Sequence, residues 1–100
     1  MIRIIESQTF IDWIKALRDR SAQTRIAARI RRLQLGNPGD IKPVGGGISE
    51  LRINYGPGYR VYLVQRGTTI IVLLCGGDKS TQSADIAKAK ALAKETYDAE

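Results

Sequence analysis

Three cationic side chains flank the turns of a predicted β region in the second half of the chain. Arg52 and Arg60 lie in two short segments on either side of Gly56-Pro57-Gly58, and Lys79 follows a third apolar segment that stops at Gly76-Gly77. Arginine can hold a phosphate through two parallel hydrogen bonds, and fixed cations stabilise the extra charge of a pentacoordinate transition state. These residue types favour binding, and chemistry, on an anionic substrate that carries a phosphate.

The absent residue types narrow that chemistry. The chain has no histidine and one cysteine, Cys75, and it contains neither a P-loop nor a dinucleotide fingerprint. Zinc sites, serine triads and histidine acid–base catalysis are therefore disfavoured, and we expect no metal and no cofactor. Cys75 follows an apolar run, which favours a buried, inert thiol.

Length and charge bound the class of protein. The 100 residues predict one domain, 1–100, and the net charge of +6 favours an anionic partner such as nucleic acid, the ribosome or an acidic protein. No stretch approaches the ~20 apolar residues of a membrane span, and the N-terminus lacks the pattern of a signal peptide. We therefore expect no membrane association and a cytoplasmic location.

Alternation in two segments predicts which side chains share a face. In Ile48–Tyr55 and Tyr59–Gln65, apolar residues alternate with polar ones. Side chains two residues apart lie on the same side of a strand. One face should therefore join the core, and the other should be partly open and carry Arg52, Arg60 and Tyr62. The residues expected in the core are Leu51, Ile53, Val61 and Leu63. As an alternative, Arg52 would only pair with Glu50 or Asp78 at the surface.

The remaining elements complete an α+β fold of order β-α-α-β-β-β-α. The N-terminal strand and an αα-hairpin should pack on a mostly antiparallel sheet, with the helices on one face and a helix at the C-terminal end. The glycine runs Gly45-Gly46-Gly47 and Gly76-Gly77 are expected to be hinge or turn residues. Strands are expected at Ile2–Ile5 and Thr68–Cys75, and Ile41–Gly47 should be a loop or weak edge strand. Helices are expected at Thr9–Leu17 (capped by Ser7 or Thr9), at Ala22–Leu35 (capped by Ser21) and, capped by Ser80 or Thr81, through about Tyr97.

The second helix carries a cationic stripe. Arg25, Arg29 and Arg32 follow the spacing i, i+4, i+7, which places them on one side of a helix. The stripe favours docking on an RNA phosphate backbone, although a solvated helix face or a contact with an acidic protein would produce the same pattern. Tyr59 and Tyr62 could stack on a base, and Asp78 could assist binding or cap the last helix.

Two blocks of sequence resemble a known family. The run Leu51–Tyr62, with its Gly-Pro-Gly turn, and the run Leu73–Gln82 followed by Asp85–Ala89 resemble the RelE/ParE superfamily of bacterial type II toxins. The chain is most similar to the HigB-like "addiction module killer protein" branch, which is related to phage Gp49-like proteins. The resemblance covers essentially the whole chain.

The resemblance implies a toxin inhibited by a cognate antitoxin, usually a helix-turn-helix DNA-binding protein. It implies an endoribonuclease that cuts mRNA on the ribosome without a metal, through attack of the RNA 2′-hydroxyl on the adjacent phosphate. By position, Arg60 would stabilise transition-state charge, Arg52 would position the phosphate, and Lys79 would bind phosphate or transfer a proton. The catalytic tyrosine of some relatives has one counterpart here, Tyr97. The same fold also allows a ParE-like poison of DNA gyrase or a degenerate module that only binds antitoxin.

Overall fold

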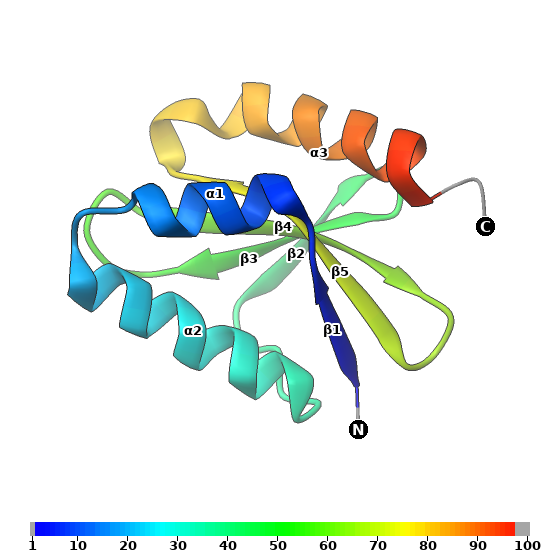
Figure 1. The fold of residues 1–100 in the computed structure, drawn as a ribbon, viewed down its shortest axis with the longest axis horizontal. Helices are drawn as coiled ribbons and strands as arrows, with labels where there is room; N and C mark the ends of the chain where they lie inside the picture. Colours follow the sequence, from blue (N-terminus) through cyan, green and yellow to red (C-terminus); the bar gives the residue numbers. More distant parts are fainter. Residues whose placement is uncertain (1, 98–100) are drawn as a thin grey trace.

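The computed structural model describes residues 2–97, with side chains for residues 2–95. The chain forms a five-stranded sheet with helices on both sides (Figure 1). The elements in order are β1 (Arg3–Glu6), α1 (Gln8–Ala16), α2 (Arg20–Gln34), β2 (Ile41–Gly45), β3 (Ile48–Ile53), β4 (Tyr59–Arg66), β5 (Ile70–Gly77), a short 3₁₀ turn (Lys79–Thr81) and α3 (Gln82–Tyr97). The predicted α+β class and element order are confirmed, and the segment left open as a loop or edge strand is the strand β2.

The sheet has the order β1-β5-β4-β3-β2. Strand β1 pairs in parallel with β5, and the other described pairs are antiparallel. The sheet is therefore mixed but mostly antiparallel, as predicted. Strand β4 lies at the centre, and its neighbours β3 and β5 carry the segments that hold Arg52 and Lys79 beside Arg60.

One face of the sheet packs against α1 and α2. The four strand residues expected in the core all lie in this cluster, together with Phe10 from α1 and with Ile26 and Leu33 from α2. Trp13 packs against the same cluster at its edge, with its ring centroid 6.3 Å from that of Tyr59. The alternation in β3 and β4 therefore identified this face of the sheet correctly.

The expectation that all helices share one face of the sheet is wrong. Helix α3 packs on the other face, where Ala89 and Ala93 join a cluster with Tyr62, Val64 and side chains of β5. That face stays partly open, as expected, at Arg52, whose side chain is 38% exposed. The small residues of α3 let the helix approach the sheet closely. Helices α1 and α2 therefore lie on one face of the sheet, and α3 lies on the other (Figure 1). Cys75 lies in this second core, and burial raises the pKa of its thiol to about 11. The side chain of Tyr97 lies outside the described residues.

The capping residues agree with an expected alternative at two helices and differ at one. Ser7 caps α1 by accepting a hydrogen bond from the backbone N–H of Phe10. Asp19, rather than Ser21, caps α2, because its carboxylate accepts from the N–H groups of Ser21 and Ala22. Asp78 caps the 3₁₀ turn ahead of α3. At both Asp19 and Asp78 a carboxylate precedes the hydroxyl residues, and its negative charge is favourable at a helix N-terminus.

No helix in residues 2–97 is long and apolar enough to cross a membrane. The longest of these helices, α3, has 16 residues, and it carries several charged side chains.

Gly76 and Gly77 are strand residues, so the expectation that they form a turn is wrong. They are the last two residues of β5. A Cβ built on Gly76 would lie 2.3 Å from Cε3 of Trp13. On Gly77 a Cβ would lie 1.8 Å from a carboxylate oxygen of Asp85. Helix side chains thus occupy the space that side chains of this strand would need.

We expect Gly76→Ala to destabilise the fold by about 1–3 kcal/mol through overpacking against Trp13. Urea unfolding of the variant and the wild type measures the loss. In a Trp13→Leu background, the same substitution should cost less, because the clashing ring is gone. An equal cost in both backgrounds would contradict the packing described here.

Candidate active site

Strand register places the two predicted arginines directly opposite each other. Arg52 of β3 pairs with Arg60 of β4, and Arg60 pairs with Gly77 of β5. Directly opposed residues of antiparallel strands project to the same face. The tight turn over residues 54–58, closed by a hydrogen bond from the N–H of Gly58 to the carbonyl of Tyr55 (3.1 Å), brings the two strands together beside this pair.

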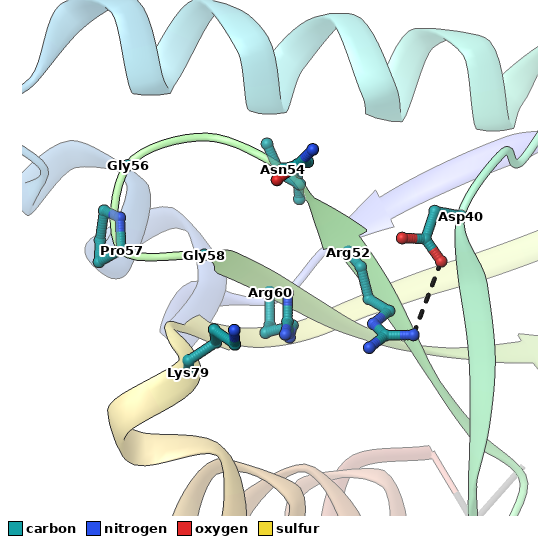
Figure 2. A pocket seen from close by; sticks show the side chains of 9 residues that line it. Asp40, Arg52, Asn54, Gly56, Pro57, Gly58, Arg60 and Lys79 are labelled. Atoms are coloured by element: carbon teal, nitrogen blue, oxygen red, sulfur yellow. Dashed lines mark ion pairs between the residues drawn. The ribbon is translucent and has the colours of Figure 1, made fainter.

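A concave pocket of about 350 Å³ opens at this end of the sheet. Figure 2 shows Arg52, Arg60 and Lys79 beside one another along it, with the hairpin turn at one end. Lys79 comes from the turn that starts α3, so three separate segments supply the cations. Asp40 is the acidic side chain among the described residues that line the pocket. The structure therefore brings all three predicted catalytic residues to one pocket.

A buried carboxylate, Glu50, lies beneath the arginines. Its side chain is 1% exposed, and its Oε1 atom lies 3.6 Å from Nε of Arg52 and 3.7 Å from Nε of Arg60. Oε2 accepts hydrogen bonds from the hydroxyl of Tyr62 (3.1 Å) and from Nε2 of Gln82 (2.7 Å). Glu50 was expected to be a surface partner of Arg52 at most. Its position two residues before Arg52 in an alternating strand was the signal that it shares the arginines' face.

Burial separates the roles open to the two arginines. Arg60 is 6% exposed, and within the described residues its ion-pair partner is Glu50. The side chain of Arg52 is 38% exposed and also lies 3.8 Å from Asp40, whose side chain is 60% exposed. Arg60 is thus fixed and largely desolvated, whereas Arg52 stands at the rim. A desolvated cation interacts more strongly with charge that develops near it.

Arg29 of α2 holds the two backbone segments that carry Asp40 and Arg52 at the rim of the pocket. Its guanidinium donates to the backbone carbonyls of Arg52, Pro38 (3.0 Å) and Asp40 (3.2 Å). Burial, with a further contribution from nearby Arg32, lowers the pKa of Arg29, which nevertheless stays protonated at neutral pH. Arg29 therefore ties the segment before β2 to β3 through its Nη1 and Nη2 atoms.

The other stripe residues lie apart from the pocket. Arg25 stacks over the ring of Tyr55, 4.4 Å from its centroid. A separate hollow of about 310 Å³ beside residues 53–55 is lined by all three stripe arginines, Arg25, Arg29 and Arg32. This hollow lies on the α2 side of the hairpin. The structure therefore does not bring the α2 stripe together with Arg60 and Lys79.

The other predicted RNA-binding residues, Tyr59, Tyr62 and Asp78, also lie away from the pocket. Tyr62 is 0% exposed, so its ring is covered by α3, and its hydroxyl serves the buried network with Glu50. Tyr59 is half-buried on the α1 side, against Trp13. The hydrogen bonds from Ser80 lower the pKa of Asp78, and this carboxylate stays ionised as a cap. None of the three lines the pocket among the described residues.

Gly58 lets Lys79 approach the hairpin turn. Its φ is +80°, and a Cβ built there would lie 2.8 Å from Cγ and Cδ of Lys79 and 3.8 Å from Nη1 of Arg60. The alkyl chain of Lys79 therefore packs on bare backbone, which places its ammonium group beside Arg60. This contact explains a glycine at the last position of the turn.

We expect Gly58→Ala to displace Lys79 and to slow turnover of the natural substrate by about 10-fold, a loss of ~1.4 kcal/mol. Gly67→Ala is the matched control, because Gly67, in the turn between β4 and β5, also has positive φ (+67°), and a Cβ built there would have nothing within 4 Å. Both variants should lose similar stability from backbone strain. Equal activity of the two variants would show that the contact with Lys79 does not matter.

The described fold, an α+β domain with a five-stranded mixed sheet and three helices, is consistent with a RelE-like fold. The family described as "Phage derived protein Gp49-like (DUF891)" matches residues 12–98. The chain belongs to this family, which is RelE-like and toxin-like. It is also similar to an uncharacterized protein of Haemophilus influenzae, at 54% identity over 94 residues, or 94% of this chain and 95% of that protein.

Proposed function

We propose that this chain is the toxin of a type II toxin–antitoxin pair and that it cleaves mRNA on the ribosome. The observation that carries the proposal is the convergence of Arg52, Arg60 and Lys79 on one pocket at the end of the sheet. The three cations outnumber the two nearby carboxylates, Asp40 and Glu50, so the pocket suits a phosphodiester. Membership of the Gp49-like family supports the toxin assignment.

The reaction proposed for this pocket is transfer of the phosphoryl group to the neighbouring 2′-oxygen of the RNA. The bond from O2′ to phosphorus forms and the bond from phosphorus to O5′ breaks, which leaves a 2′,3′-cyclic phosphate and a 5′-hydroxyl. Arg60 faces the charge that develops on the non-bridging oxygens, and Arg52 at the rim positions the phosphate.

Asp40 and Lys79 are the two side chains at the pocket suited to move the protons. The carboxylate of Asp40 can accept the proton of the 2′-hydroxyl, and the ammonium of Lys79 can donate one to the departing O5′. Glu50 is less suited, because it is buried beneath the arginines and its Oε2 already accepts two hydrogen bonds.

Toeprinting on translating ribosomes tests the function. The purified wild type should create new mRNA ends on actively translated messages, and the Arg52→Ala variant should create far fewer. A gyrase supercoiling reaction run in parallel should be unaffected. Inhibition of supercoiling without any new mRNA ends would reject the proposed function in favour of a gyrase poison.

We expect Asp40→Asn to slow mRNA cleavage by about 10²-fold while it leaves RNA affinity unchanged or raises it. The substitution removes a proton acceptor and also one negative charge from the rim of a phosphate pocket. Single-turnover cleavage and equilibrium binding to non-cleavable RNA separate the two effects. Weaker binding at an unchanged cleavage rate would show that Asp40 acts only on the geometry of Arg52.

The cognate antitoxin is expected to neutralise the protein by covering this pocket with acidic side chains. Protection of Arg60 and Lys79 in the complex would follow. A small helix-turn-helix gene next to this one would supply the candidate partner. If the complex left both cations fully accessible to solvent, inhibition would have to act in another way.

A further inference from the structure

The buried carboxylate of Glu50 is oriented through one of its two oxygens. Its Oε1 atom faces Arg52 and Arg60 but makes no hydrogen bond within the described residues, because both arginine Nε atoms lie more than 3.5 Å away. Its Oε2 atom accepts from the hydroxyl of Tyr62 and from Nε2 of Gln82. A carboxylate only accepts hydrogen bonds, so both partners donate to it. The direction in which the carboxylate presents its charge to the arginines therefore depends on two neutral donors.

The two donors come from different parts of the fold. Tyr62 lies directly opposite Glu50 in the sheet register and is fully buried. Burial, with a further contribution from Glu50, raises the pKa of this hydroxyl, so it stays protonated and donates at neutral pH. Gln82 follows the 3₁₀ turn, begins α3 and lies 32 residues along the chain from Glu50. Gln82 is thus the donor whose position depends on how α3 begins.

The 3₁₀ turn ahead of α3 also carries Lys79, three residues before Gln82. The other described side-chain hydrogen bonds of this turn and its cap stay within residues 78–85. The hydrogen bond from Gln82 to Glu50, at 2.7 Å, instead crosses to the sheet. It therefore joins the segment that holds Lys79 to the carboxylate that faces both arginines.

We propose that Gln82 is a positioning residue that holds the three cations of the pocket in one geometry by donating to Glu50. This role rests on the proposed function, because that function requires three cations around one phosphate. Gln82 does not line the pocket among the described residues, so its effect on the reaction must pass through its partners. Groups that stabilise transition-state charge have to be held to within about 0.5 Å, which is why such a support affects the rate.

Gln82→Glu tests this role, because the new carboxyl imitates the amide only while it is protonated. When protonated it donates to Glu50 as the amide does, and when ionised it places a second negative charge against that carboxylate. Two adjacent carboxyls do not both ionise easily, so the pKa of the introduced group should be raised. The other charged or titratable side chains around this network are shared with the wild type, so the ratio of the two rates isolates the new group. They are Arg52 of β3, Arg60 and Tyr62 of β4, Cys75 of β5, Lys79 of the 3₁₀ turn and Asp85 of α3.

Single-turnover mRNA cleavage by Gln82→Glu is measured relative to the wild type between pH 8 and pH 6. The relative rate should be about 10-fold below the wild type at pH 8 and should rise about 5-fold as the pH falls, since protonation restores the donor. Carbon-13 NMR of the introduced carboxyl should titrate with the same midpoint. The matched control is Gln8→Glu, because Gln8 donates to the exposed carboxylate of Asp12 (2.8 Å), on α1. Its relative rate should stay near that of the wild type at every pH.

A second readout needs no substrate and separates this role from the proposed function. In Gln82→Leu, the NMR signals of the Nε–H of Arg60 and of the amide of Gly58, on which Lys79 packs, should shift, whereas Gln8→Leu should leave both in place. Unchanged signals, an ordinary pKa for the introduced carboxyl, or a relative cleavage rate that does not depend on pH would overturn the role of Gln82. Shifted signals together with a wild type that cuts no mRNA on ribosomes would reject only the proposed function.

Discussion

Arg60→Ala is expected to reduce mRNA cleavage by about 10³-fold, the loss seen when an arginine that faces transition-state phosphate charge is removed. Arg60 is 6% exposed and is fixed between Glu50 and the pocket, so water replaces its charge poorly. Single-turnover cleavage on translating ribosomes measures the effect. Figure 2 shows the guanidinium between Arg52 and Lys79, where no third arginine among the pocket's described residues can supply the missing charge.

Two further variants make this result specific. Arg60→Lys keeps the charge but loses the planar pair of donors, and it should recover only part of the rate. Arg31→Ala removes an exposed arginine of α2 that bonds Gln34, and it should leave the rate unchanged. If Arg60→Ala folded normally and cut mRNA at the wild-type rate, the assignment of Arg60 would be wrong.

Glu50→Ala is expected to lower the free energy of unfolding by about 3 kcal/mol, because it leaves Arg60 as a buried cation without its carboxylate. The substitution also removes the acceptor of Tyr62 and Gln82 inside the second core. Urea unfolding gives the change in stability from the shift in midpoint at a constant slope. Asp12→Ala, at an exposed carboxylate that accepts from Gln8, is the control and should change stability by less than about 0.5 kcal/mol.

A second comparison distinguishes charge from shape. Glu50→Gln keeps the volume and can still accept from the hydroxyl of Tyr62, but it cannot balance the two arginines. We expect it to be destabilising and to weaken cleavage, because repulsion between Arg52 and Arg60 is no longer offset. A stable and fully active Glu50→Gln variant would show that the carboxylate charge is dispensable for the site.

The strand alternation was enough to place the arginines. Side chains alternate between the two faces of a strand with a period of two residues. Once the turn at Gly56–Gly58 fixed the pairing of β3 with β4, Arg52 and Arg60 had to share the face away from the apolar core residues of these strands. The position of Lys79 also followed from the sequence, since a lysine directly after a central strand must lie at that end of the sheet. The three segments that supply the cations of the pocket were therefore predictable.

The cover on the arginines' face was harder to foresee. The stripe of Ile86, Ala89 and Ala93 is weakly apolar, so its burial depends on the fit of small side chains against Tyr62 and Val64, which only the tertiary structure shows. The same covering turned Glu50 from an expected surface carboxylate into a buried one. The structural role of Arg29 could not be predicted from the sequence. In a helix that carries many arginines, the pattern does not show which guanidinium donates to three backbone carbonyls.

We propose above that this pocket cleaves RNA through the neighbouring 2′-hydroxyl. The most direct measurement uses an mRNA with a single 2′-deoxy nucleotide at a mapped cut site on translating ribosomes, compared with the all-ribose message. We expect the wild-type protein to cut the all-ribose message, leaving a 2′,3′-cyclic phosphate, and to leave the deoxy position intact. Cleavage of the deoxy position at the same rate, or products with a 5′-phosphate, would contradict the mechanism.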